Sequence, residues 1–366
     1  MNTYRLAVIP GDGVGREVIP EGMKVLQAAA QRFGFGIEPT ELPWGCGHYL
    51  QQGAMMPPDA LACLREFDAI YLGAIGDPRV PDHVSLWGLL LPIRKAFDLY
   101  ANVRPIRLLE GIDTPLAGRS PHEIDILFVR ENTEGEYAGV GGRVATGSPD
   151  EVALQTAVYT RRATERILRY AFERARGRRK KLAHITKSNA LQYTAVLWDE
   201  VAQAVARDYS DVQVWKLHVD AAAYQMVLHP DWFDVMVGSN LYADILTDLG
   251  AALQGSLGLA ASANLDPSRT RPSMFEPVHG SAPDIAGKGM ANPMAAIWTA
   301  SLLLEHLGEP AAAEATFDAL RAVVRDRHVR TPDLGGRSQT VEVGDAVVEA
   351  MRARGPQAAG RVQAQR

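Results

Sequence analysis

The sequence predicts an α/β protein with a parallel or mixed sheet at its core. Short β-branched apolar runs alternate with longer amphipathic segments, which is the pattern of strands joined by helical crossovers. The chain has 366 residues, of which 47% are hydrophobic and 22% charged. Because this length and composition are typical of a globular chain that builds more than one core, we expect two domains.

The strands are expected at short apolar runs, and a helix-like segment follows most of them. These runs lie at residues 5–9, 69–72, 125–129, 181–186, 212–217 and 233–237. The clearest helix is predicted at residues 154–175, with Gly177 where glycine commonly ends a helix. The basic run 176–181 carries no interleaved aromatic residue, so we interpret it as a solvated face. Only the tail after Arg354 is expected to be disordered.

Charge and cysteine content exclude several classes of protein. The 38 basic and 43 acidic residues give a net charge of −5, which favours neither nucleic acid nor an anionic membrane as a partner. Cys46 and Cys63 show no metal-type spacing, so a reducing cytoplasm fits. The N-terminus lacks the pattern of a secretory signal, and the longest apolar block, residues 293–304, is too short to span a bilayer.

The N-terminal stretch IPGDGVGREV is a glycine-rich turn between a predicted strand and a predicted helix. Gly11 and Gly13 match the first two positions of the dinucleotide fingerprint GxGxxG, but Arg16 occupies the last. A Rossmann site needs that third glycine for close packing of helix and strand. We therefore expect a turn that changes the chain direction and not a Rossmann fold.

A second glycine-rich segment, EPVHGSAPDIAGKGMANP, carries more chemistry. It combines His279, the backbone amides of Gly280 and Ser281, the carboxylate of Asp284 and a predicted helix start after Asn292. Backbone amides and helix starts bind phosphates, and a carboxylate can accept hydrogen bonds from ribose hydroxyls. The segment indicates a nucleotide site.

Three arginines lie next to apolar sequence that would carry them toward the interior. They are Arg94 in LLLPIRK, Arg104 in ANVRP and Arg130 at the end of IDILFVR. A buried guanidinium requires an anion, and a charge-assisted hydrogen bond to a carboxylate contributes about 1.5–3 kcal/mol. Each arginine alone is more often part of a structural ion pair, but the three together suggest a site for a polycarboxylate.

Two like charges stand four residues apart in the stretch GSNLYADILTDLGA. If this segment is helical, Asp244 and Asp248 lie on one face, where their repulsion costs about 0.2–0.5 kcal/mol in water. A helix edge facing solvent would explain a random pair of this kind. The alternative is a cation held between the two carboxylates.

These residues belong to a series of motifs that resembles the isocitrate and isopropylmalate dehydrogenase family over nearly the whole chain. In chain order the motifs are IPGDGVGREV, LGAIG, LPIRKAFDLYANVRP, VRENTEGEY, HITKSNAL, VDAAAYQMV, GSNLYADILTDLGAAL and EPVHGSAPDIAGKGMANP. The resemblance implies the two-domain α/β fold of isopropylmalate dehydrogenase, which is not a Rossmann fold. It assigns residues 1–100 with 255–366 to a larger cofactor domain, and residues 101–254 to a metal-binding and dimerisation domain.

The resemblance also implies a role for each candidate site residue. Arg94, Arg104 and Arg130 would hold the substrate carboxylates, while Asp220, Asp244 and Asp248 would bind Mg²⁺ or Mn²⁺. Lys187, beside Asp220, would act as the base and Tyr137 as the acid. Lys187 and Asp220 would reach the site from the partner subunit of a homodimer. Without the motifs, a lysine after a strand is usually solvated and this tyrosine could cap a turn.

For the cofactor, the resemblance implies NAD held by two segments and three single residues. The residues are Ala74 and Ile75, Asn189, the stretch with Glu276, His279, Gly280, Ser281, Ala282, Asp284 and Ile285, then Asn292 and Asp333. Asp284 decides between the two nicotinamide cofactors, because its charge would repel the 2′-phosphate of NADP.

The segment before Arg94 determines which hydroxy acid is expected. Ser85, Trp87 and Leu90 stand in SLWGLLLPIR, and Trp87 with Leu90 and Leu91 would form a dry wall that fits a short C3 substituent. This stretch most resembles tartrate and decarboxylating D-malate dehydrogenases, with 3-isopropylmalate as the alternative substrate. Two other classes of protein remain open: a metal-dependent lyase without nicotinamide, and a non-catalytic carboxylate-binding protein.

Overall fold

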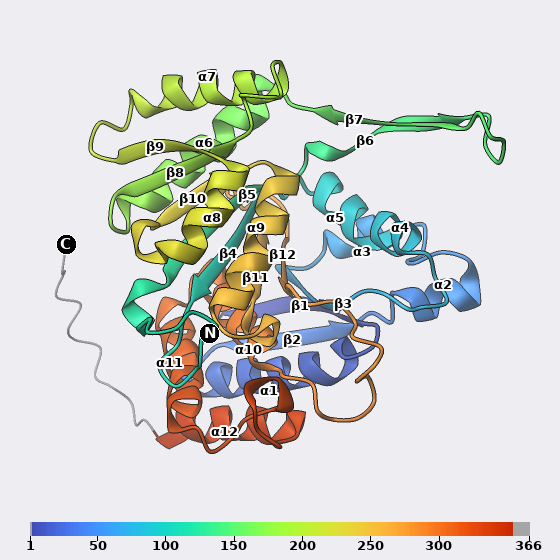
Figure 1. Cartoon of the computed structure of the whole chain (residues 1–366). Coiled ribbons are helices and arrows are strands. Elements are labelled where there is room, and N and C mark those ends of the chain that lie inside the picture. The colour runs from blue at the N-terminus through green and yellow to red at the C-terminus, as the bar shows by residue number, and fades with distance from the viewer. Residues whose placement is uncertain (1, 354–366) are drawn as a thin grey trace.

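The computed structural model describes residues 2–353, and a mixed ten-stranded sheet runs through it (Figure 1). In spatial order the strands are β2 (Gly36–Glu41), β1 (Thr3–Gly11), β3 (Ala69–Ala74), β12 (Ser273–Pro277), β11 (Ala261–Leu265), β4 (Ala101–Arg107), β5 (Asp125–Glu131), β10 (Val235–Gly238), β8 (Lys181–Thr186) and β9 (Gln213–His218). Antiparallel pairing is confined to the middle of the sheet, where β12, β11, β4 and β5 adjoin. The predicted α/β class with a parallel or mixed sheet is confirmed.

Helices cover both faces of this sheet. They are α1 (Gly15–Phe33), α2 (Cys46–Gln52), α3 (Ala60–Leu64), α4 (Asp82–Ser85), α5 (Leu91–Ala96), α6 (Arg161–Arg176), α7 (Thr194–Ala206), α8 (Val219–Leu228), α9 (Asn240–Leu253), α10 (Met294–Leu307), α11 (Pro310–Asp326) and α12 (Thr340–Ala353). None of the helices between residues 2 and 353 is both long and apolar enough to cross a membrane. The tail after Arg354, where we expect disorder, lies outside the described residues.

All six predicted strands occur, within two residues of their predicted starts, but the predicted helix at 154–175 begins too early. Residues 152–158 form strand β7 (Val152–Val158), which pairs with β6 (Gly135–Val144) in a two-stranded hairpin that projects from the body (Figure 1). Helix α6 begins only at Arg161, because the Thr160 side chain accepts a hydrogen bond from the amide of Ala163 and caps it. Gly177 ends α6 with a φ of −77°, and the left-handed residue is Lys180.

The solvated-face interpretation of the basic run 176–181 is wrong for the Arg178 side chain, whereas Arg179 is exposed and contributes its backbone amide. Arg178 donates from Nε to Asp234 Oδ1 at 2.7 Å, and the Arg179 amide donates to Asp234 Oδ2 at 2.7 Å. The Asp234 side chain is completely buried. The run therefore compensates a buried carboxylate, which the sequence pattern could not show because Asp234 lies far away in the chain.

The glycine-rich turn at residues 11–13 connects β1 to α1, as predicted. Gly11 and Gly13 have positive φ angles of 72° and 52°. A Cβ atom on Gly13 would come within 2.0 Å of the Ser281 carbonyl oxygen, and the Val14 amide donates to that same oxygen at 2.9 Å. The two glycine-rich segments of the sequence therefore pack against each other at the edge of the sheet.

Strands β11 and β12 connect the two segments that we predict as separate domains. β12 pairs with β3, and β11 pairs with β4, so residues of 255–366 lie between strands of 1–100 and of 101–254. Hydrophobic clusters form on α1 with α10 and α12, on α6 with α7, and around β3 with α5. The division into two domains stays a prediction, but the joining strands also carry the candidate site.

Candidate active site

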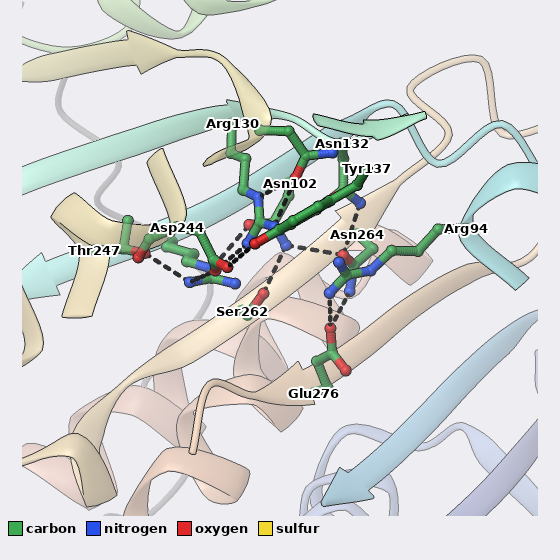
Figure 2. Close-up of polar contacts among 12 residues, drawn as sticks. Arg94, Asn102, Arg130, Asn132, Tyr137, Asp244, Thr247, Ser262, Asn264 and Glu276 are labelled. Atoms are coloured by element: carbon green, nitrogen blue, oxygen red, sulfur yellow. Dashed lines mark hydrogen bonds and ion pairs between the residues drawn. The ribbon is translucent and has the colours of Figure 1, made fainter. Parts of the chain in front are cut away.

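A cavity of about 220 Å³ lies over the middle of the sheet, where parallel pairing gives way to antiparallel pairing. Figure 2 shows the polar side chains that meet there. Strands β3, β4, β5, β11 and β12 supply its floor, and α5, β6 and α9 supply its sides. Its lining residues are Gly73, Ala74, Ile75, Leu86, Leu90, Leu91, Arg94, Arg104, Arg130, Tyr137, Asp244, Ser262, Glu276, Pro277, Val278, His279 and Gly280. Segments from both predicted domains thus meet in one concave site.

The three predicted arginines converge on this cavity and are buried, with exposed fractions of 4% for Arg94, 6% for Arg104 and 2% for Arg130. Each has an acidic partner. Arg94 Nη2 lies 2.6 Å from Glu276 Oε1, Arg104 Nη1 lies 3.2 Å from Asp244 Oδ1, and Arg130 Nη1 also bonds to Asp244 Oδ1. The guanidiniums therefore form internal ion pairs and still face the cavity.

Three positive charges lie close together in a buried site, which favours the binding of anions. Burial lowers the pKa of Arg130 to about 9, the nearby Asp244 carboxylate opposes that shift, and the charges of Arg104 and Arg94 add to it. Burial likewise lowers the pKa of Arg104. Because three guanidiniums share only two carboxylates among these contacts, an added dianion would relieve their mutual repulsion.

Helix α9 carries the two aspartates, and the predicted helix is confirmed over Asn240–Leu253. Burial acts to raise the Asp244 pKa, but Arg130, Arg104 and Arg94 outweigh it and the pKa is lowered. The Asp248 pKa is raised by desolvation and by the Asp244 charge, against the opposing charge of Arg104. The Asp248 side chain is exposed, and among residues 2–353 it makes no side-chain hydrogen bond or ion pair. Asp248 is thus an under-compensated carboxylate beside the cavity.

A divalent cation fits these two carboxylates as part of its ligand set. Carboxylate oxygens suit Mg²⁺ and Mn²⁺, which also keep several water ligands. Among the described residues of one chain, no three His, Cys, Asp or Glu side chains gather to hold a metal ion. Asp220 lies instead on α8, where its Oδ1 is 2.6 Å from Lys187 Nζ and its side chain is 68% exposed. Its expected arrival from a partner subunit stays a prediction.

Tyr137 stands on β6 at the mouth of the cavity. Its hydroxyl donates to Asp244 Oδ2 at 3.1 Å, and the Arg130 guanidinium lies 5.7 Å from the centre of its ring. Desolvation raises the Tyr137 pKa, and the Asp244 charge raises it further. The phenol therefore retains its proton, which is the form that an acid requires.

The predicted cofactor residues fall into three groups. The first lines the cavity and contains Ala74, Ile75, Glu276, His279 and Gly280. The second lies along the neighbouring turn and contains Ser281, Ala282, Asp284 and Ile285, where Ala282 has a positive φ of 41°. Asp284 is exposed, and no hydrogen bond to its side chain occurs between residues 2 and 353. Its carboxylate is therefore free to accept hydrogen bonds from a ligand.

The third cofactor group lies farther along the chain. Asn292 Nδ2 donates to Asp333 Oδ2 at 3.0 Å, and the Asn292 Oδ1 atom accepts from the amide of Met294 at the start of α10. These two predicted residues are therefore brought together, as expected for one side of a nucleotide site. Asn189 is exposed after β8 and lies outside the cavity lining.

The predicted substrate wall is only partly placed on the cavity. Leu90 and Leu91 line it together with Leu86, on a π-helical turn over Leu86–Leu90 that joins α4 to α5. Ser85 lies outside this lining, and its hydroxyl donates to the Asp82 carbonyl. Trp87 also lies outside: its ring packs 4.5 Å from Lys95 Nζ. A π-helical turn contains one more residue than an α-helical turn, so the side chains that follow it point in other directions than α-helical spacing predicts.

Sequence reasoning missed the amides that hold this site. Asn102 and Asn132 are buried beneath the arginines, and each donates to Asn264 Oδ1 at 2.9 Å (Figure 2). Asn240 Oδ1 accepts from Arg130 Nε at 2.9 Å. The available signal was an asparagine inside each of two short apolar strands, ANVRP and ASANL. A polar side chain in such a strand is buried only with hydrogen-bond partners, so it indicates a local network.

The model of the isocitrate/isopropylmalate dehydrogenase family matches residues 5–347 of this chain. The D-malate dehydrogenase (decarboxylating) of Escherichia coli strain K12 is 50% identical over 355 residues, which cover 95% of this chain and 98% of that protein. A Bacillus subtilis strain 168 protein named "Probable tartrate dehydrogenase/decarboxylase" is 49% identical, covering 96% of this chain and 99% of that protein.

A solved structure agrees with these relatives. The crystal structure of isocitrate dehydrogenase from Methylococcus capsulatus superimposes with a TM-score of 0.86 at 38% identity, covering 95% of this chain and 99% of that one. The fold, the full-length match and the relatives at about half identity all agree with the expected resemblance. This chain belongs to the isocitrate/isopropylmalate dehydrogenase family.

Proposed function

We propose that this protein is an NAD- and divalent-metal-dependent dehydrogenase that oxidises a small 2-hydroxy dicarboxylic acid, D-malate or tartrate, and decarboxylates the oxidised D-malate. The observation that carries the proposal is the convergence of three buried arginines, Asp244 and Tyr137 on one cavity. Relatives at about 50% identity bear the names of tartrate and decarboxylating D-malate dehydrogenases, which supports this substrate class.

The arginines orient the substrate. Arg94, Arg104 and Arg130 present guanidinium groups to the same cavity, and such groups bind carboxylates with two parallel hydrogen bonds. Two carboxylates held apart fix the C2 hydroxyl between them, so its hydrogen faces one direction only. Asp244 and Asp248 would hold the cation, which when bound supplies Lewis-acid stabilisation of negative oxygen charge.

Proton transfers are assigned to two side chains. We infer that Lys187, held by Asp220 at 2.6 Å, takes the hydroxyl proton as hydride leaves C2 for the cofactor. Oxidation precedes loss of CO₂, because only a carbonyl at C2 can accept the electrons of the breaking bond. Tyr137, whose raised pKa keeps it protonated beside Asp244, then protonates the carbon that lost CO₂.

The cofactor choice rests on Asp284. Its exposed carboxylate can accept hydrogen bonds from the adenosine ribose, whereas a 2′-phosphate would be repelled. We therefore expect NAD⁺ to be used with higher catalytic efficiency than NADP⁺. Initial rates with both cofactors at saturating D-malate and Mn²⁺ test this, and a preference for NADP⁺ would refute the assignment.

The apolar wall supports a small substrate. Leu86, Leu90 and Leu91 face a cavity of about 220 Å³ that must also hold the carboxylates. The expected order of kcat/KM is D-malate and tartrate above 3-isopropylmalate. A dominant value for 3-isopropylmalate would favour the alternative assignment, which the retained leucines support through their affinity for an isopropyl group.

We also propose a homodimer with shared sites in the cytoplasm. Lys187 and Asp220 lie outside the cavity lining, so the site gains its base only if another chain supplies it. Large apolar side chains are exposed on α8 and α9, which pack together, and on the β6–β7 hairpin: Tyr224, Val227, Leu228, Ile245, Val140, Val144, Val152 and Leu154. Such surfaces are typical of interfaces between copies of a chain.

A metal-dependent lyase would use the same arginines and aspartates without nicotinamide. The two functions are separated by mixing the protein with Mn²⁺, D-malate and NAD⁺ and recording absorbance at the wavelength of reduced nicotinamide. The dehydrogenase gives a rising signal and CO₂ together. Release of CO₂ with no change in absorbance would establish the lyase.

A further inference from the structure

Two buried amides connect the arginine side of the cavity to Glu276. Arg104 Nε donates to Asn102 Oδ1 at 2.9 Å, Asn102 Nδ2 donates to Asn264 Oδ1 at 2.9 Å, and Asn264 Nδ2 donates to Glu276 Oε1 at 2.9 Å (Figure 2). We call Asn102 and Asn264 the amide relay. Every bond along it runs in the same direction, from the guanidinium to the carboxylate.

The side-chain amides of Asn102 and Asn264 cannot exchange the positions of their oxygen and nitrogen atoms. A guanidinium only donates, so Asn102 must present its oxygen to Arg104 and its amino group to Asn264. An ionised carboxylate only accepts, so Asn264 must present its amino group to Glu276. Both side chains are completely buried, and their remaining donor contacts are Ser262 Oγ for Asn102 and the Met274 carbonyl for Asn264.

The backbone beneath the relay consists of paired strands. Asn102 and Asn264 are direct partners in the antiparallel pairing of β4 with β11, and Ser262 is the partner of Glu276 in the pairing of β11 with β12. Side chains directly opposite each other in an antiparallel pair lie on one face of the sheet. A displacement at one end of the relay is therefore passed to the other end instead of being absorbed by a loop.

Glu276 stands where the two predicted ligands meet. Its Oε1 atom accepts from Asn264 and also from Arg94 Nη2 at 2.6 Å. It is also the first residue of the predicted cofactor segment. Two of the three guanidiniums, those of Arg94 and Arg104, thus end on a single carboxylate, one directly and one through the relay.

We propose that Asn264 is a positioning residue that couples nicotinamide-cofactor binding at Glu276 to dicarboxylate binding at Arg94 and Arg104. This inference rests on the proposed function. A cofactor seated against Glu276 fixes that carboxylate, and Asn264 then fixes Asn102 and Arg104. Whichever of the cofactor and the dicarboxylate binds first orders the guanidiniums. The other ligand then binds more tightly, and this effect is the same in both directions.

The test measures binding instead of turnover. NADH cannot accept a hydride from D-malate, so the protein, Mn²⁺, NADH and D-malate form a complex that does not react. Titration of D-malate with and without saturating NADH gives two dissociation constants, and their ratio is the coupling factor. For the wild-type protein we expect a factor of about five or more, in the usual range for coupled sites.

Two substitutions at one position break the relay in different ways. Asn264→Leu removes both relay bonds while Asn102 keeps Ser262 and Glu276 keeps Arg94. Asn264→Asp keeps the acceptor for Asn102 and replaces the donor that faces Glu276. Both variants should lower the coupling factor below about two, which is close to the value of one that means no coupling. If one variant fails to fold, the other still decides the outcome.

Asn132→Leu is the matched control. Asn132 is 2% exposed and donates to Asn264 Oδ1 at 2.9 Å and to the Leu99 carbonyl at 3.0 Å, but it contacts neither an arginine nor Glu276. Its coupling factor should stay within twofold of wild type. The proposal is overturned if wild type shows no coupling, if the Asn264 variants keep it, or if Asn132→Leu loses it equally. A wild-type protein that binds neither NADH nor D-malate would instead refute the proposed function.

Discussion

Two ion pairs of the candidate site each join a basic side chain to an aspartate, but one is buried and the other is exposed. Arg130 and Asp244 meet beneath the cavity, with side chains 2% and 35% exposed, whereas Lys187 and Asp220 meet on the surface, at 28% and 68%. Burial lowers the Arg130 pKa to about 9. The Asp220 pKa is lowered mainly by its hydrogen bond from Lys187, without burial. Burial therefore dominates the pKa shift in the first pair, and direct hydrogen bonding dominates it in the second.

This difference in burial separates the candidate site into a buried half around Arg130 and Asp244, which one chain completes, and an exposed half formed by Lys187 and Asp220. The buried half holds its arginines in place through Asp244, Asn240 and Asn102, so its geometry is preorganised within one chain. The exposed half has no such enclosure, and an exposed ion pair contributes little to stability because solvent screens it. The proposed role of Lys187 as a base requires a drier place, which a second chain packed over it would provide.

The largest expected effect is at Asp244. Asp244→Asn should reduce activity beyond detection, and it should lower the free energy of unfolding by about 3–5 kcal/mol, because Arg130 and Arg104 lose their buried counter-charge. Unfolding in urea followed by circular dichroism measures this loss. A variant as stable as wild type would show that the buried pair is not what holds the arginines.

Asp248→Asn is the matched control for that variant. Its folded pKa is raised, so this carboxyl contributes stability below the unfolded pKa and loses it as pH rises through the folded value. Asp248→Asn should therefore be at least as stable as wild type at pH 7, with the difference vanishing near pH 3. Both aspartate variants should bind Mn²⁺ more weakly, which calorimetry detects without turnover.

Lys187→Ala tests the exposed half. The variant should keep its stability within about 1 kcal/mol and lose about 10²–10⁴-fold in kcat. Mixing it with Asp248→Asn after brief denaturation should restore about a quarter of wild-type activity, because half of the randomly formed dimers carry one intact site. No recovery in refolded mixtures would argue for sites contained within single chains.

A second contrast of buried and exposed pairs lies away from the site. Arg178 neutralises the fully buried Asp234, whereas Arg176 binds the surface residue Asp211 at 2.9 Å. Arg178→Leu should cost about 1.5–3 kcal/mol of unfolding free energy, and Arg176→Leu should cost much less. Equal losses in urea unfolding would contradict the view that burial sets the strength of these pairs.

The smallest predicted effect on stability concerns His306, a half-buried side chain that is neutral at pH 7. Burial, assisted by the nearby Arg269 charge, lowers the His306 pKa to about 4. The unfolded chain takes up this proton first, so His306 contributes stability above about pH 6.5 that is lost progressively as pH falls toward 4. His306→Gln should flatten the stability profile in that interval. An unchanged profile would exclude His306 as a source of acid sensitivity.

Much of the fold followed from local patterns. Six apolar runs became strands, and the turn at Gly11 and Gly13 needed only the positive φ that glycine allows. The helix start at Arg161 was missed, because residues 152–158 have apolar spacing that suits either period and their pairing with β6 decided the outcome. Trp87 was placed on the substrate wall, but a π-helical turn directs it toward Lys95.

The sequence by itself determined which groups could carry the chemistry: three arginines beside apolar strands, paired aspartates on one helix face, and an acidic residue in a glycine-rich turn. Local spacing suffices for these, because it fixes side-chain type and helix face. The tertiary structure decided their partners, joining Arg94 to Glu276 and connecting Arg104 to Glu276 through Asn102 and Asn264. Arg94 and Glu276 are 182 positions apart in the chain, and Asn102 and Asn264 are 162 positions apart. The pairing of β4 with β11 and of β11 with β12 brings Asn102, Asn264 and Glu276 within hydrogen-bonding distance.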